Sequence, residues 1–312
     1  MGRMEENKKK IIITGGAGFI GSNLADELVA QGGYEVHVID NLKNGIRSNI
    51  PDKAVFHKLD IEDYYGLLRL FKRIGDIYCV FHMAALPRVQ FSIKKQRRSL
   101  DTNIDGTLHV LLAAKNMGVR RVVYSASSSA YGDQTMLPLR EEMAPNPKSP
   151  YGIQKLVGEY YTKVFYECYG LETVSLRYFN VYGPKQNDEG AYALVIGVFL
   201  NQHASGEPLT ITGDGKQTRD FTNVKDVVRA NIIAMESPSV GKGEVINIGA
   251  GRGVSILELA RLIGGEVKFV EARIEPHHTH ADNTQARELL GWTPRVSIEE
   301  GIAELKRLRG LD

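Results

Sequence analysis

The sequence predicts an α/β protein with a doubly wound parallel sheet and a smaller, mixed α/β unit. Three observations support this fold class. Short β-branched runs alternate with helical patterns through the first half of the chain. These runs are apolar on both faces, as in parallel strands covered by helices. A glycine-rich turn joins the first predicted strand to the first predicted helix. With 312 residues, 43% of them hydrophobic, the chain can form one large domain or two closely joined ones.

The predicted elements follow this alternation along the chain. Predicted strands are 10–14, 34–40, 54–58, 77–84, 121–125, 172–177 and 245–249. Predicted helices are 21–31, 100–117, 151–169, 193–203, 224–235 and 255–263, with a helical turn at 287–290. The rhythm changes after residue 177, where 181–220 is rich in Gly, Pro, Asn and Gln. We therefore expect a nucleotide-binding Rossmann domain of 1–177 and 220–249, and a substrate domain of 178–219 and 250–312.

Composition argues against several classes of protein. The formal net charge of +2 gives no support for nucleic-acid or membrane-surface binding. The sequence lacks an apolar run of about 18 residues and a signal-peptide pattern, so we expect a cytoplasmic protein. Cys79 and Cys168 indicate a reduced compartment and two packing residues. His277, His278 and His280 cluster without a zinc-ligand pattern, so we expect no metal site.

The glycine-rich turn predicts a phosphate-binding loop. Residues 15–21 read GGAGFIG, which places Gly15, Gly18 and Gly21 between a strand and a helix. Glycines allow a tight turn and close approach of a pyrophosphate, and the helix N-terminus favours its charge. An ordinary glycine-rich turn is the alternative, which the strand–loop–helix context disfavours.

The end of the second strand predicts which dinucleotide binds. Asp40 lies 19 residues beyond Gly21, where a carboxylate hydrogen-bonds the ribose diol and repels a 2′-phosphate. NAD is therefore favoured over NADP. We expect further cofactor contacts from the first helical turn and from the neighbouring strand ends, at Phe19, Ile20, Asn41, Asn44, Asp60 and Ile61.

A second motif begins the helix predicted at 151–169. Residues 149–155 read SPYGIQK; Ser149 suits the N-cap and Pro150 the first helical position. Tyr151 and Lys155 are then i,i+4 neighbours on one helical face. Taken alone, the pair also fits a half-buried aromatic residue and a solvated charge.

Together these motifs resemble the extended short-chain dehydrogenase/reductase family, and most of all its nucleotide-sugar 4-epimerases. The resemblance covers nearly the whole chain. It rests on the glycine loop, the Tyr-x-x-x-Lys pair and a serine four residues before a Tyr-Gly. Further matching segments are His82-Met83-Ala84-Ala85, Asn103, RYFNVYGP at 177–184, Arg219-Asp220-Phe221 and LGWTP at 290–294.

The resemblance implies a catalytic group of Ser127, Tyr151 and Lys155. A free tyrosine has a pKa near 10, so a nearby lysine ammonium and nicotinamide ring would favour the phenolate. Tyr151 would take a proton from a sugar hydroxyl while NAD accepts the hydride, and Ser127 would position the reacting oxygen. The resemblance also implies a homodimer paired through helices 100–117 and 151–169. Implied cofactor contacts are Ala84, Ala85, Asn103, Ser125, Tyr151, Lys155 and Tyr178.

Two serines bear on the reaction. Related 4,6-dehydratases carry Asp and Glu after the residue matching Ser127, and related decarboxylases carry a glutamate in the same segment. This chain has Ser128 and Ser129, whose hydroxyls cannot replace carboxylates at neutral pH. The residues thus favour 4-epimerisation. A non-catalytic dinucleotide sensor is the rival from another class, against which the intact Ser127, Tyr151 and Lys155 argue.

The resemblance further implies a UDP-linked sugar as substrate. The small Thr279 matches a family position that faces the sugar's 2-substituent, so UDP-GlcNAc and UDP-GalNAc should fit. UDP-glucose and UDP-glucuronate epimerases remain alternatives, and Arg88 is an unexplained charge that leaves an acidic sugar open. Residues matching the substrate site are Arg88, Ser127, Ser128, Ser129, Tyr151, Asn180, Ala193, Leu194, Val195, Arg219, Arg273 and Thr279.

Overall fold

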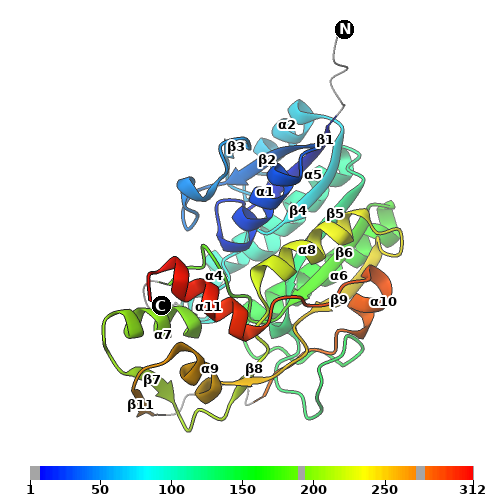
Figure 1. Ribbon diagram of the computed structural model, residues 1–312. Coiled ribbons are helices and arrows are strands. Elements are labelled where there is room, and N and C mark those ends of the chain that lie inside the picture. Colours follow the sequence, from blue (N-terminus) through cyan, green and yellow to red (C-terminus); the bar gives the residue numbers. More distant parts are fainter. Residues whose placement is uncertain (1–7, 189–193, 272–277, 312) are drawn as a thin grey trace.

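A computed structural model describes residues 8–188, 194–271 and 278–311 of the chain (Figure 1). Its main feature is a seven-stranded sheet in the order β3-β2-β1-β4-β5-β6-β9, in which every neighbouring pair is parallel. The strands are β1 Lys9–Thr14, β2 Tyr34–Asp40, β3 Val55–Lys58, β4 Ile77–His82, β5 Arg121–Ser127, β6 Glu172–Tyr178 and β9 Lys242–Ile248. The strand order reverses direction between β1 and β4, which confirms the doubly wound fold and marks where such sheets bind ligands.

Helices cover both faces of this sheet. One face packs against α1 Phe19–Gln31, α8 Val224–Glu236 and α10 Thr284–Leu290. The other packs against α2 Tyr64–Ile74, α5 Gly106–Asn116 and α6 Pro150–Tyr169. In β1, Ile11 and Ile13 belong to the first core and Ile12 to the second, and all three are fully buried. This two-sided burial is why the strands are continuous apolar runs.

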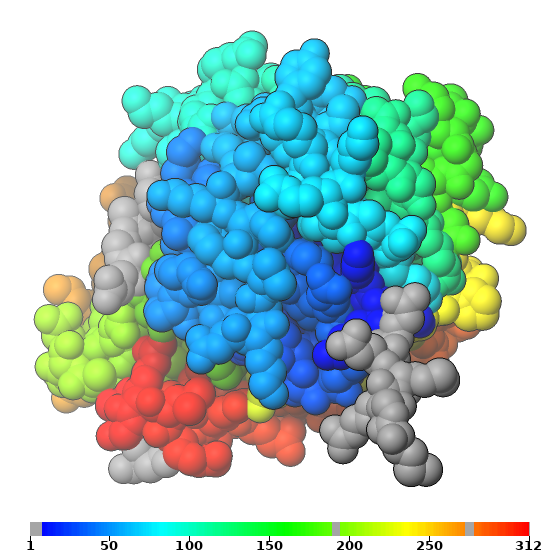
Figure 2. Space-filling model, turned by 90° about the horizontal axis from the view of Figure 1, so that it is seen from above, coloured from blue at the N-terminus to red at the C-terminus, as the bar shows by residue number. Residues whose placement is uncertain are grey.

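A smaller unit has its own apolar core, drawn in the lower part of Figure 1. It contains the helices α7 Val195–Ala204, α9 Ile256–Ile263 and α11 Ile298–Leu308. Its strands form two small sheets, of β7 Leu209–Thr212 with β11 Val267–Val270, and of β8 Thr218–Arg219 with β10 Val254–Ser255. Figure 2 shows the blue-to-cyan first half as one continuous mass, with α11 and α7 at its border.

Within the described residues, three α-helices are absent from the sequence prediction, namely α2, α11 and the short α3, Val89–Lys94. α2 begins after Asp63, whose side chain accepts the N–H of Gly66, and α11 begins with a capping box of Ser297 and Glu300. Both caps were visible in the sequence. The helix predicted at 100–117 also differs, because α4 Gln96–Leu100 passes through a π-helical turn, Asp101–Asp105, before α5 begins.

The prediction for the cysteines was half wrong. Cys79 is buried in the first core, but Cys168 is exposed. The buried face of α6 ends at Phe165, one turn before Cys168, so the last turn of the helix faces solvent. Within the described residues, no helix is both long and apolar enough to cross a membrane.

Candidate active site

The glycine loop leaves no space for side chains between β1 and the segment that follows β4. Gly15 has a φ of +70°, and a Cβ there would lie 2.7 Å from the Cα and backbone nitrogen of Ala84. A Cβ on Gly21 would lie 2.4 Å from the carbonyl oxygen of Gly15. No side chain caps the start of α1, and its first turn, beginning Phe19-Ile20, has no acidic residue. Its backbone N–H groups are thus directed at a close-packed cradle suited to a phosphate.

Asp40 adds a carboxylate beside this loop. Its oxygens accept the N–H groups of Ala17 at 3.1 Å and Leu42 at 2.8 Å. Burial raises the pKa of Asp40, while these two hydrogen bonds oppose the rise. The neighbouring Asn41 side chain donates to Asp60 at 2.9 Å. A glycine cradle, an uncapped helix and a carboxylate at the end of β2 are the features that an adenine dinucleotide requires, so these residues fit NAD.

Other predicted cofactor residues adjoin this cradle. The backbone nitrogen of Ala84 donates to the Thr14 hydroxyl at 3.3 Å, and Ile61 is buried. Ser125 and Tyr178 lie on the adjacent strands β5 and β6. The Tyr178 hydroxyl donates to Asn231 at 2.9 Å, so it is held inside the core. Asn44 and Ala85 also lie in the segments after β2 and β4, Asn44 at the surface and Ala85 half-buried.

The structure brings Ser127 and Tyr151 together at the ends of β5 and α6. The Ser127 hydroxyl accepts the N–H of Ser129 at 3.2 Å and the Ser129 hydroxyl at 2.9 Å, which fixes its position. Burial raises the pKa of Tyr151 to about 12, while a hydrogen bond with Ser127 and the positive charge of Arg88 act in the opposite direction. Ser127 and Arg88 thus favour the ionised phenol, while burial disfavours it.

Lys155 lies one helical turn beyond Tyr151 and is almost fully buried. Its ammonium donates to the carbonyl oxygen of Ser125 at 2.6 Å and lies 5.0 Å from the centre of the Tyr124 ring. Burial lowers the pKa of Lys155 to about 7, and the charge of Glu159 acts against this. The charge of Arg88 lowers the pKa of the Tyr151 phenol. The effect of the Lys155 ammonium on that phenol stays a prediction.

A buried ion pair supports this lysine, and sequence reasoning missed it. Both carboxylate oxygens of Glu159 accept hydrogen bonds from Arg177, at 2.8 and 2.7 Å. The guanidinium also lies 4.5 Å from the centre of the Tyr131 ring. A signal was present, because Glu159 follows Lys155 by four residues and shares its helical face. Helical spacing could not predict the partner of Glu159, because Arg177 lies on β6.

Asn103 and Gln154 form a second buried network. Asn103, in the π-helical turn, accepts the N–H of Leu86 at 2.7 Å and donates to the Gln154 side chain at 2.7 Å. Ser99 donates to the same oxygen of Gln154 at 2.7 Å. The predicted cofactor residue Asn103 therefore ties the segment after β4 to α6. Gln154 thus joins these two elements.

The predicted substrate residues of the smaller unit gather around Asp220. This buried carboxylate accepts the N–H groups of Ala250 at 2.7 Å, Gly251 at 2.9 Å and Ala281 at 2.9 Å. The Asn180 amide donates to the Asp220 carbonyl oxygen at 3.3 Å. One carboxylate thus holds the ends of β8 and β9 and the segment after residue 278.

Arg219 and Thr279 lie on either side of this centre. Arg219 belongs to β8, and the N–H of Thr279 donates to the carbonyl oxygen of Thr218 at 3.2 Å. The Thr279 hydroxyl is buried and has no hydrogen-bond partner in the described chain. An orphaned buried hydroxyl suits a ligand contact. Leu194 and Val195 begin α7, whereas Ala193 and Arg273 lie outside the described residues.

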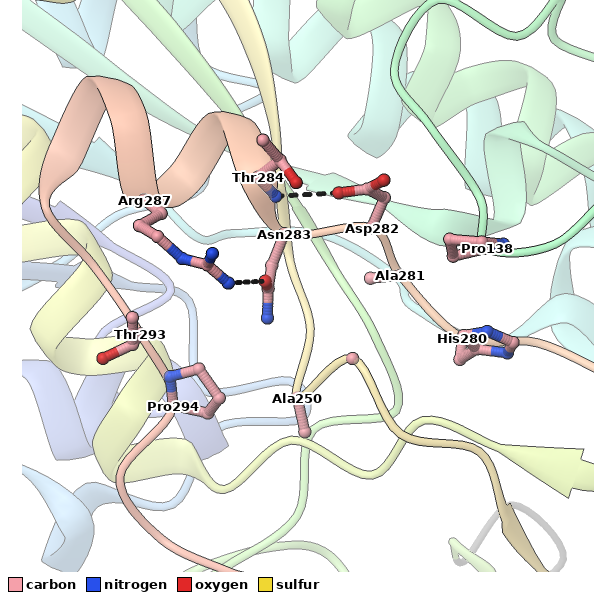
Figure 3. A pocket seen from close by; sticks show the side chains of 11 residues that line it. Pro138, Ala250, His280, Ala281, Asp282, Asn283, Thr284, Arg287, Thr293 and Pro294 are labelled. Atoms are coloured by element: carbon pink, nitrogen blue, oxygen red, sulfur yellow. Dashed lines mark hydrogen bonds between the residues drawn. The ribbon is translucent and has the colours of Figure 1, made fainter.

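A separate hollow of about 550 Å³ lies near α10 (Figure 3). Its polar side chains largely bond to one another; Asp282 accepts the N–H of Thr284 at 2.9 Å, and Arg287 donates to Asn283 at 3.5 Å. None of the residues predicted for catalysis lines it. We therefore place the chemistry at Tyr151 and not in this hollow.

These features fit a dinucleotide-dependent enzyme, and Tyr151 stays the predicted acid–base group. Residues 11–249 match the NAD dependent epimerase/dehydratase family, and the chain belongs to that family. It is therefore an NAD-dependent enzyme, as the sequence predicted.

The chain is similar to named members along almost its whole length. It is 38% identical to a putative UDP-glucose 4-epimerase of Methanocaldococcus jannaschii, over 94% of this chain and 95% of the relative. A UDP-glucose 4-epimerase of Thermotoga maritima, solved with UDP-glucose, is 39% identical with a TM-score of 0.91, covering 97% and 100% of the two chains. A UDP-N-acetylglucosamine 4-epimerase of Methanobrevibacter ruminantium, solved with UDP-N-acetylmuramic acid, is 35% identical with a TM-score of 0.89, covering 96% and 99%. Uronic acid decarboxylases are also among its relatives.

Proposed function

We propose that this protein is a UDP-sugar 4-epimerase. The observation that carries the proposal is the group at the ends of β5 and α6, where Ser127 acts on the pKa of Tyr151 and the two residues after Ser127 are serines. Epimerisation needs one acid–base group at the reacting oxygen, which Tyr151 supplies. Elimination of water needs further carboxylates, and Ser129 instead donates its hydroxyl to Ser127. The similarity to two named 4-epimerase structures supports the same reaction.

The chain's own residues hold the reacting oxygen and move its proton. NAD, held by the glycine cradle and Asp40, would supply reversible hydride transfer at C4 of the sugar. Tyr151 takes the proton of the C4 hydroxyl and returns it after the sugar has turned over. Ser127, fixed by Ser129, positions the oxygen, and Lys155 is placed to contact the nicotinamide ribose. The remaining predicted contacts to NAD stay proposals.

The preferred substrates in this proposal are UDP-GlcNAc and UDP-GalNAc. Thr279 has a small side chain with an unpaired buried hydroxyl, which leaves room for an acetamido group and offers it a hydrogen bond. Asn180 and Arg219 lie next to Asp220, and we expect the diphosphate to bind there. UDP-glucose is the second candidate, because a site that admits an acetamido group also admits a hydroxyl.

We expect a homodimer that acts in the cytoplasm, with neither nucleic acid nor membrane as partner. α6 exposes a row of apolar side chains, formed by Ile153, Tyr160 and Val164. Phe165 of the same helix is buried in the core and is not available to a partner. Light scattering should show a dimer, and Tyr160→Glu should yield monomer; a wild-type monomer would contradict this expectation.

The first test incubates the purified protein with UDP-GlcNAc, with and without added NAD, and follows products by proton NMR. UDP-GalNAc should form with no net NADH. Tyr151→Phe should lower turnover by about 10²- to 10⁴-fold, the usual contribution of a general acid–base group. A 4-keto-6-deoxy product, or unchanged turnover in Tyr151→Phe, would contradict the proposal.

A second test concerns the acetamido group. Thr279→Tyr should fill the space beside the sugar, so that UDP-GlcNAc turnover falls while UDP-glucose turnover is kept. Thr279→Ser serves as the matched control, since it keeps the hydroxyl and adds no volume. Equal loss of both sugars in Thr279→Tyr would show that Thr279 does not select the 2-substituent.

A further inference from the structure

Arg88 lies beside the reacting tyrosine without a place in the reaction proposed above. It follows β4 and forms the N-cap of the short helix α3, Val89–Lys94. Its carbonyl oxygen accepts the N–H of Ser92 at 2.9 Å, and the Ser92 hydroxyl in turn accepts the N–H of Tyr151 at 3.1 Å. Ser92 therefore links the backbone of Arg88 to the backbone of Tyr151. The charge of the guanidinium lowers the pKa of the Tyr151 phenol.

This guanidinium lacks a counter-charge. Arg88 is half-buried, and within the described chain no hydrogen bond or ion pair engages its side chain. Burial lowers the pKa of Arg88, and the Tyr151 hydroxyl is the ionisable group that opposes this. A guanidinium has five N–H donors and is always charged in proteins, so leaving it partly desolvated and unpaired is costly. An anionic ligand would remove that cost.

Three other cations near the site are already engaged. Lys155 donates to the Ser125 carbonyl oxygen at 2.6 Å, and Arg177 is paired with Glu159. Lys185, which follows the RYFNVYGP segment, donates to Asp26 and to the carbonyl oxygen of Asn49. Arg88 is therefore better placed than these three to bind a substrate anion beside Tyr151.

We propose that Arg88 binds a carboxylate on C5 of the sugar, so that the substrates include UDP-linked hexuronic acids. This inference rests on the 4-epimerase proposal, because Tyr151 must then meet the hydroxyl on C4. C5 is the next ring carbon, so its carboxylate lies beside the reacting oxygen, where Arg88 acts. A planar guanidinium can bind a carboxylate through two parallel hydrogen bonds. The space beside Thr279 also admits an acetamido derivative of such an acid.

The ion pair has a consequence for the product. With a ketone on C4, the C5 carboxylate belongs to a β-keto acid, which can lose carbon dioxide. The C5–C6 bond then breaks, its electron pair forms an enolate on the C4 oxygen, and C5 takes up a proton. Arg88 holds the negative charge on the carboxylate, so it opposes this loss. The immediate product is a UDP-4-keto-pentose, which becomes a UDP-pentose when hydride returns to C4. Removing Arg88 should therefore increase the share of these two pentose products.

The experiment compares two matched substrate pairs on the purified holoenzyme. The pairs are UDP-glucose with UDP-glucuronate, and UDP-GlcNAc with its uronic acid; each pair differs only in the oxidation of C6. Arg88→Gln should lower the ratio of kcat/KM for acid over neutral sugar by about 10- to 100-fold, the usual effect of losing a charge-assisted hydrogen bond. Arg88→Lys should restore part of the ratio, because lysine keeps the positive charge but lacks the two parallel N–H donors of the guanidinium.

Arg97→Gln is the matched control, since it removes one exposed arginine charge from the neighbouring helix α4 and should leave the ratio unchanged. An equal loss on both members of a pair would overturn the inference and assign Arg88 to Tyr151 alone. Turnover of neutral sugars by wild type, with none of the acids, would overturn it while the epimerase stands. No turnover of any UDP-sugar would overturn both proposals. Thermal melting of each variant checks that it is folded.

Discussion

Replacing the buried Lys155 by methionine should abolish catalysis and at the same time stabilise the nucleotide-free protein. Lys155 is 3% exposed, and its pKa falls from an ordinary 10.5 to about 7 because burial disfavours the charged form. The difference is about 3.5 pH units, and each unit corresponds to about 1.4 kcal/mol, so the charged ammonium costs roughly 5 kcal/mol. The hydrogen bond to the Ser125 carbonyl oxygen offsets about 1 kcal/mol of this. Lys155→Met should therefore gain about 2–4 kcal/mol.

The sign of the pH dependence follows from proton binding. Between pH 7 and 10.5 the unfolded chain keeps the Lys155 proton and the folded chain has lost it. The unfolded state then binds more protons, so wild-type stability rises with pH in this window relative to a variant without the group. The advantage of Lys155→Met should be largest at or below pH 7 and should shrink as the pH approaches 10.

Urea unfolding at pH 6.5 and at pH 9.5 measures both effects. At pH 6.5 the variant should also melt roughly 5–10 °C higher, at about 2–4 °C per kcal/mol. Lys163→Met, an exposed lysine of the same helix, is the control and should show the same small difference at both pH values. A variant less stable than wild type at pH 6.5, or a difference independent of pH, would refute the reasoning.

Three further substitutions test the supporting structure. Gly15→Ala should lose bound NAD, because its Cβ would lie 2.7 Å from Ala84; nucleotide released by acid measures this, and full retention would contradict the cradle. Glu159→Gln should lower the free energy of unfolding by about 3–5 kcal/mol, since it leaves the buried Arg177 without its charge partner. A loss below about 1 kcal/mol in urea titrations would contradict it. Gln154→Leu should cost about 1–3 kcal/mol by leaving Asn103 unpaired, and an unchanged urea midpoint would show that this network adds nothing.

Local sequence signals predicted the main structural elements of this molecule. The strand–loop–helix pattern around Gly15, the acidic residue at the end of β2 and the caps Ser149 and Pro150 each act within a few residues of one another. Ser149 does accept the N–H of Gly152 at 3.1 Å, and α6 begins at Pro150. Such short-range rules hold because backbone geometry decides them before tertiary contacts form.

The electrostatic surroundings of the site could not be predicted in this way. Arg177 reaches Glu159 across 18 positions, and Asn103 reaches Gln154 across 51, so no periodicity reports either contact. The partner of the Lys155 ammonium is a backbone carbonyl, which has no signature in the sequence. The helices α2 and α11 are a different case, because their N-caps Asp63 and Ser297 are local sequence signals.

The junction at Asp220 bears on how proteins of this shape can change in evolution. One carboxylate accepts three backbone N–H groups from two segments that are far apart in the chain, 250–251 and the segment of Ala281. A substrate unit held by these hydrogen bonds cannot be replaced as a whole by an unrelated segment. Any replacement must present the same N–H groups to Asp220 at the same points. We therefore expect new sugar preferences to arise by single substitutions, for example at the proposed specificity positions 88 and 279, with the contacts of Asp220 kept.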